Sequence, residues 1–158
     1  MSWNPFDEAI LKNDAGNCCV VSCNGMHLCG YCRIPATDLP KEWHGDYDAD
    51  ALQYLRIHGG ITFCDVSGAD VIFGFDCAHA GDEDRDDLRV PAVVLTLAET
   101  MRVLICRYSS KITEWRNGDT QTRCCILDEI NTGITESVGF GAMLDMLGGY
   151  SKITGDQS

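Results

Sequence analysis

The feature that most constrains the fold is the dipeptide Asn24-Gly25, which separates two apolar runs, CCVVSC and MHLCGYCRI. Asparagine and glycine are the residues that most readily adopt two consecutive positive φ angles, as a tight two-residue hairpin turn requires. The sequence therefore predicts a β-hairpin with strands at residues 17–23 and 26–34. Pro35 is expected to end the second strand.

Helical periodicity is clearest after Pro91, where apolar residues recur every three or four positions. This pattern predicts the main helix at about 91–108, packed on the sheet. A first short helix is expected after Asn4, which can cap it, and should end near Asn13.

Further β structure is expected on either side of this helix. Apolar runs at 61–66 and 71–75 predict a second hairpin, and Asn117-Gly118 predicts a C-terminal hairpin. A short helix is expected over 138–147. The expected fold class is α+β: antiparallel hairpins form a sheet that packs against one main helix.

The length of 158 residues fits one domain. We expect a single α+β domain at 1–150, with 109–150 as a possible C-terminal extension and 151–158 as a frayed tail. The chain has no stretch of eighteen apolar residues, and its N-terminus lacks the basic and apolar regions of a signal peptide. We therefore expect a cytoplasmic protein with no membrane partner. The sequence leaves a homo-oligomer possible.

The formal net charge of -12 is concentrated in one block. Residues 38–87 hold thirteen acidic and three basic side chains, a net of -10. Such a surface repels long nucleic acids but can attract a cation or the basic face of a host protein. It can equally serve only as a solvated face that keeps the protein soluble.

Ten cysteines are present, and without a secretory signal we expect them to be reduced. Cys29 and Cys32 form a C-x-x-C motif, but their odd spacing within a strand predicts that the two thiols point to opposite faces. A zinc site that combines Cys23, Cys29 and Cys32 with Cys18 or His27 is a further alternative, although C-x-x-C occurs only once.

The segment HGGITF contains the first candidate binding residues, His58, Gly59, Gly60 and Thr62. Paired glycines let backbone amides turn toward a ligand, and the histidine can donate to a phosphate or accept a proton. A sharp turn that leads into a strand explains the same residues without a ligand.

The segment GFDCAHAGD contains the second set, Asp76, His79 and Asp82, at the end of a predicted strand. With His58 these side chains could hold a divalent metal, although the spacing matches no strong zinc pattern. An aspartate that caps local amides, beside a histidine bonded to a core carbonyl, is the simpler explanation. No cofactor is therefore predicted, and a divalent metal remains the alternative.

Other side chains could complete a ligand pocket. The aromatic residues Trp43, Tyr47 and Tyr54 lie near HGG and could stack on a ring, although core packing is the more ordinary role. Arg33, Arg56 and Arg89 could neutralise a phosphate. The common nucleophile and nucleotide motifs, such as G-x-S-x-G and Walker A, are absent from the sequence.

The motifs NGMHLCGYCRIP, GDYDAD, HGGITF and GFDCAHAGD occur in this order over about residues 24–108. In order and spacing they resemble a family of small uncharacterised bacteriophage and prophage proteins with the motifs HGG[IL]T[FY] and GFDxAHxGD. This sequence departs from that family at Cys29, where a polar residue is common, and the segment from 109 onward resembles an extension. The resemblance implies a viral accessory protein in the host cytoplasm, and such proteins often oppose host defence.

Three functions follow as hypotheses. The first is a phage accessory protein that binds and sequesters a small, nucleotide-type signalling ligand. The second is a metal-dependent phosphodiester hydrolase that uses His58, Asp76, His79 and Asp82. The third is an acidic binder of a host protein, or a nucleic acid mimic. Because no nucleophile motif is present, binding is favoured over catalysis.

Overall fold

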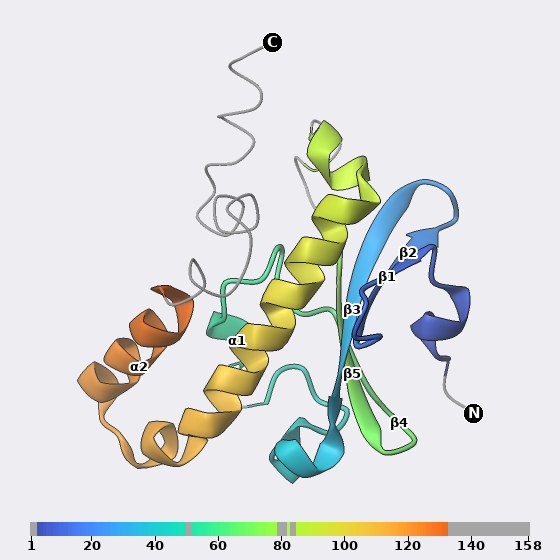
Figure 1. Cartoon of the computed structure of the whole chain (residues 1–158). Coiled ribbons are helices and arrows are strands. Elements are labelled where there is room, and N and C mark those ends of the chain that lie inside the picture. Colours follow the sequence, from blue (N-terminus) through green and yellow to red (C-terminus); the bar gives the residue numbers. More distant parts are fainter. Residues whose placement is uncertain (1–2, 50–51, 79–81, 83–84, 133–158) are drawn as a thin grey trace.

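The computed structural model describes residues 3–49, 52–78, 82 and 85–132. Its centre is a five-stranded antiparallel sheet in the order β1-β2-β3-β5-β4. The strands are β1 (Leu11–Lys12), β2 (Cys18–Cys23), β3 (His27–Pro35), β4 (Phe63–Ser67) and β5 (Asp70–Asp76). Two helices follow, α1 (Pro91–Asn117) and α2 (Thr120–Thr132), and α1 lies across one face of the sheet (Figure 1). The α+β prediction is confirmed.

Both predicted N-terminal hairpins are present. Asn24 and Gly25 adopt φ angles of 55° and 68°, so the β2–β3 turn has the two positive φ values that the dipeptide predicts. The β4–β5 hairpin turns at Ser67–Asp70, as expected. The sequence did not predict strand β1, which pairs with β2.

The first helix is shorter than predicted. It is a 3-10 helix, η1 (Pro5–Glu8), and the side chain of Asn4 accepts a hydrogen bond from the Phe6 amide. The segment before Asn13 instead forms β1, because the amides of Ile10 and Asn13 donate to the carbonyls of Val20 and Cys18 on β2. Sheet pairing supplies the partners that a longer helix would otherwise have to provide.

The predicted C-terminal hairpin is wrong. Helix α1 runs to Asn117, nine residues beyond the predicted end at 108, and Gly118 has φ −87° and ψ 156° rather than a positive φ. Tyr108 and Trp115 are both buried, so the helical burial pattern continues through the segment assigned to a strand. The side chain of Asp119 accepts from the Thr122 amide at 2.9 Å and caps α2, an interaction that lowers the pKa of its carboxyl group.

The sheet has a core on each face. The larger core lies between the sheet and α1, and its largest fully buried side chains include Trp43, Phe73, Phe75 and Tyr108. The polar segment 36–50 predicts a loop with little regular structure, but it contains short 3-10 turns at Ala36–Asp38 and Lys41–Trp43. A helical turn or short strand is expected over 51–57, and a 3-10 turn is present there at Leu52–Tyr54. Just after the last of these turns, the backbone amide of Arg56 donates to the Asn131 side chain of α2 at 3.2 Å.

The smaller core covers the opposite face and contains Phe6, Cys19, Val21, Cys29, Tyr31 and Ile72. The guanidinium of Arg33 lies 4.4 Å from the Phe6 ring centroid and donates to the Gly16 carbonyl at 2.5 Å. Cys32 belongs to the larger core and Cys29 to the smaller one, which confirms that the C-x-x-C thiols point to opposite faces.

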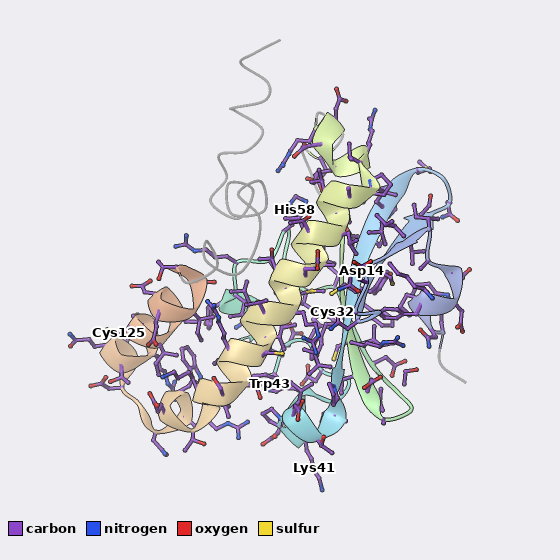
Figure 2. The ribbon with its side chains drawn as sticks, in the orientation of Figure 1. Asp14, Cys32, Lys41, Trp43, His58 and Cys125 are labelled. Carbon is purple, nitrogen blue, oxygen red and sulfur yellow. The ribbon has the colours of Figure 1, made fainter. Side chains whose placement is uncertain are left out.

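No helix of the described residues is long and apolar enough to cross a membrane. The short helix predicted over 138–147 and the tail at 151–158 lie outside the described residues. The helix α2 packs against α1 through Ile126 and Ile130, so the segment called a possible extension contributes to the same core over residues 109–132. Figure 2 shows how Trp43 and Cys32 lie on the α1 side of the sheet.

Candidate functional site

The two candidate segments meet because they flank one hairpin. HGGITF leads into β4 and GFDCAHAGD leaves β5, and these strands are antiparallel neighbours. The start of β4 therefore lies beside the end of β5. The Thr62 amide donates to the Gly74 carbonyl at 2.8 Å, which extends the ladder to the HGG turn.

The HGG segment forms the sharp turn that its glycines predict. Gly59 and Gly60 have φ angles of 66° and 84°, and the Gly60 amide donates to the Ile57 carbonyl at 2.8 Å. A residue with a Cβ atom is strained at both positions. The turn directs His58 inward, where its imidazole meets the Phe75 ring edge-on at a centroid distance of 6.3 Å. Thr62 is exposed.

The central contact of the site joins the two segments. His58 Nε2 lies 3.0 Å from Asp82 Oδ2, and the two side chains are only 11% and 8% exposed. A buried carboxylate needs such a partner, because burial without a hydrogen bond or opposite charge is costly. The pair therefore fixes the orientation of both groups next to the large core.

Asp76 does not join this pair. Residues alternate along β5, so Phe75 points into the α1-side core while Asp76 points to the opposite face, beside its β3 partner Cys29. Its side chain accepts from the Ala78 amide at 3.1 Å, the local cap expected as the simpler explanation. Of the proposed metal-binding set, His58 and Asp82 thus form a pair, and the Asp76 carboxylate lies apart from them. His79, the fourth member, lies outside the described residues.

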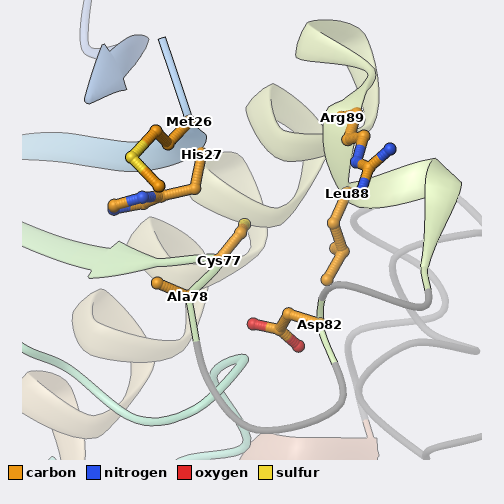
Figure 3. A pocket seen from close by; sticks show the side chains of 7 residues that line it. All are labelled: Met26, His27, Cys77, Ala78, Asp82, Leu88 and Arg89. Carbon is orange, nitrogen blue, oxygen red and sulfur yellow. The ribbon is translucent and has the colours of Figure 1, made fainter. Parts of the chain in front are cut away.

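A cavity of about 230 Å³ opens next to Asp82. It is lined by Met26, His27, Cys77, Ala78, Asp82, Leu88 and Arg89. Figure 3 shows the Asp82 carboxylate on one side of this space, between the Cys77–Ala78 strand end and Leu88, with Arg89 above it. The cavity therefore combines a buried acid, a flexible base and apolar walls, a composition typical of sites for small polar ligands.

Of the three arginines considered from the sequence, only Arg89 lines this cavity. Its side chain is 65% exposed, and its Nη1 atom lies 3.9 Å from Asp86 Oδ1. Arg33 lies against Phe6 on the other face of the sheet, and the backbone amide of Arg56 donates to Asn131. The sequence did not indicate that Met26, in the β2–β3 turn, and His27, at the start of β3, would line this cavity. Only the β3–β5 pairing brings them to the end of β5.

The aromatic residues divide into core and surface. Trp43 is fully buried and lies against Tyr108 at a centroid distance of 5.3 Å, so it packs in the core. Tyr47 and Tyr54 are exposed. Tyr54 lines a second cavity of about 360 Å³ with Trp115 and Arg123, between the Leu52–Tyr54 turn and the α1–α2 connection. None of the three lines the cavity at Asp82.

The structure also brings together a set of sulfur and nitrogen atoms. Cys23, His27 and Cys29 place one potential ligand atom each within 4.8 Å of the other two. Cys18 and Cys32, the other members of the zinc alternative, lie in the core on the opposite face. Among the described residues this is the one such group of three or more.

Comparisons with protein-family models, with curated proteins and with solved structures found no significant match. The interpretation of the site therefore depends on its geometry.

Proposed function

We propose that this protein binds and sequesters a small polar ligand in the cavity at Asp82. The observation that carries the proposal is the buried His58–Asp82 pair at 3.0 Å, whose carboxylate borders a cavity of about 230 Å³. An acid fixed in this way can accept hydrogen bonds from an amino or ring N–H group. Arg89, at the rim, can bind an anionic group of the same ligand.

A nucleotide-type signal has both groups, since its base carries N–H donors and its phosphate is anionic. The cavity is small for a whole nucleotide, because sites for drug-sized ligands occupy about 300–1,000 Å³. We therefore place the base or sugar in the cavity and the phosphate outside it, near Arg89. The proposal fits the phage accessory role in the host cytoplasm that the resemblance implies, with removal of a host signal as the function.

Sequestration and turnover can be separated in one experiment. The full chain is incubated with a panel of mono-, di- and cyclic nucleotides, removed by filtration, and heat-denatured to release what it bound. Sequestration predicts depletion from the filtrate and recovery of the intact nucleotide after heating. Recovery of an altered nucleotide would support the hydrolase alternative, and no depletion of any nucleotide would refute both.

Matched variants locate the binding. Asp82→Asn and Arg89→Gln should each weaken depletion about tenfold or more, because each removes a charged hydrogen-bonding group. Asp128→Asn and Arg116→Gln make the same chemical changes away from the cavity and should bind as the parent does. If the control pair weakens binding as much as the cavity pair, the ligand does not bind in this cavity.

The hydrolase alternative remains a prediction. Its four-residue site requires Asp76, which lies on the opposite face of the sheet from His58 and Asp82. No described feature favours the host-protein alternative beyond the acidic charge of residues 38–87.

A further inference from the structure

We propose a binding site for a thiophilic metal ion, with Zn²⁺ as the expected ion, formed by Cys23, His27 and Cys29 at the turn end of the β2–β3 hairpin. The site is independent of the proposed ligand cavity, although His27 lies at the edge of both.

Strand register brings the three side chains to one face. Cys23 and His27 are direct partners across β2 and β3, and Cys29 is two residues after His27 on the same strand. Because side chains alternate along a strand and partners share a face, all three point away from α1. The ligand atoms consequently lie within 4.8 Å of one another, with the two sulfur atoms 2.8 Å apart.

This arrangement requires only a small adjustment to hold zinc. With Zn–S bonds of about 2.3 Å and tetrahedral angles, the two sulfurs stand about 3.8 Å apart. A side-chain rotation that separates them by about 1 Å satisfies this geometry. Two thiolates and an imidazole suit Zn²⁺ and exclude Ca²⁺ and Mg²⁺, which prefer oxygen ligands.

Polar groups surround the Cys29 side of the site. Cys29 is 4% exposed and is the most buried of the three ligands. The Tyr31 hydroxyl interacts with the Cys29 sulfur, and Asp76 lies opposite Cys29 on β5, so polar groups of the kind that support zinc ligands are adjacent.

The half-buried Cys23 and His27 leave one side of the site open to solvent. Three protein ligands with an accessible fourth position are the arrangement of zinc sites that also hold a water or a small ligand. A disulfide between Cys23 and Cys29 would use the two sulfurs but gives no role to the imidazole opposite Cys23.

The test uses the reduced full chain after chelator treatment. The exposed neighbours Cys124 and Cys125 on α2 are a competing thiol pair, so Cys124→Ser/Cys125→Ser serves as the parent background. Co²⁺ is added as a spectroscopic substitute and then displaced by Zn²⁺. We expect one ion per chain, with a sulfur-to-cobalt charge-transfer band and the visible absorption of tetrahedral Co²⁺.

Single changes within this background assign the ligands. Cys23→Ser and Cys29→Ser should each weaken Zn²⁺ binding at least 100-fold, and His27→Gln at least tenfold with an altered visible spectrum. Circular dichroism checks that each variant is folded, and the half-buried Cys23 and His27 tolerate substitution better than Cys29. Asp82→Asn should leave metal binding unchanged, which separates this result from the fate of the ligand-binding proposal.

Two results would overturn the proposal. One is that the Cys124→Ser/Cys125→Ser parent binds no Co²⁺ or Zn²⁺ at micromolar concentration. The other is that binding survives both Cys23→Ser and His27→Gln. A Cys23–Cys29 disulfide that forms in air, with no ion bound after its reduction, would count as the first of these results.

Discussion

The close pairing of glycines with aromatic rings in the central strands supports a sharp test of the packing. Gly30 on β3 is the partner of Phe75 on β5. A Cβ atom added at Gly30 would lie 2.5 Å from two atoms of the Phe75 ring and 3.3 Å from the Ala98 Cβ of α1. Glycine in a strand often marks such a close approach.

Gly30→Ala should therefore destabilise the protein. Carbon atoms pack best at about 3.5–4.0 Å, so the ring must move by roughly 1 Å. Phe75 is 1% exposed and confined between the sheet and α1, and overpacking of this kind costs about 1–3 kcal/mol. The loss of unfolded-state entropy offsets about 0.4–1 kcal/mol, so we expect a net loss of about 1–2 kcal/mol.

Gly74→Ala is the matched comparison on the other face. Its Cβ would lie 2.5 Å from the Tyr31 ring and 3.2 Å from the Phe63 Cβ. Phe63 is only half-buried and Trp3, which lies against both rings, is 44% exposed. Because these side chains can move outward, Gly74→Ala should cost less than Gly30→Ala.

Urea unfolding of the reduced chain measures both changes. The cause is checked in a Phe75→Leu background, where the smaller side chain should remove most of the penalty of Gly30→Ala. The reasoning is refuted if Gly30→Ala is as stable as the parent, or if its penalty is unchanged in the Phe75→Leu background.

Two other predictions concern buried polar groups. Asp82→Ala removes the partner of His58 and should lower the free energy of unfolding by about 1–3 kcal/mol, as measured in urea. Asp128→Ala, on the exposed face of α2, should change the free energy of unfolding by no more than about 0.5 kcal/mol. Equal effects of the two substitutions would show that the His58–Asp82 pair contributes nothing to stability. Burial raises the pKa of both Cys18 and Cys19 to about 12 from the ordinary 9.0, so above pH 9 the unfolded chain loses thiol protons that the folded chain keeps. The unfolded state then binds fewer protons, and stability should fall by about 1.4 kcal/mol per thiol per pH unit between pH 9 and 12. Urea midpoints at pH 8 and 10 measure this loss, and an identical loss after Cys18→Ala and Cys19→Ala would contradict it.

The sequence predicted a turn correctly where the local residue preference was not opposed by packing in the core. Asn24-Gly25 predicts its hairpin correctly because both residues adopt positive φ without help from the rest of the chain. The same dipeptide at Asn117-Gly118 misled, because the apolar residues around it continue the helical pattern that packs on the core. Burial of Trp115 outweighs a turn preference of this size.

The two candidate segments were also identifiable from the sequence, as was the sharp turn at Gly59 and Gly60. The sequence did not show which side chains of the two segments contact each other. Asp76 and Asp82 both follow the same apolar run, yet strand alternation directs Asp76 away from His58, whereas the Asp82 carboxylate lies 3.0 Å from the His58 imidazole.

The cysteine and histidine ligands show the same division. The sequence by itself determines that Cys29 and Cys32 point to opposite faces, since that follows from the two-residue period of a strand. That Cys23 lies beside Cys29 and opposite His27 depends on the register of β2 with β3, which the turn fixes. Only the tertiary structure decides that His27 reaches the end of β5 and borders the cavity of Asp82, because contacts between distant segments depend on the packing of the whole sheet.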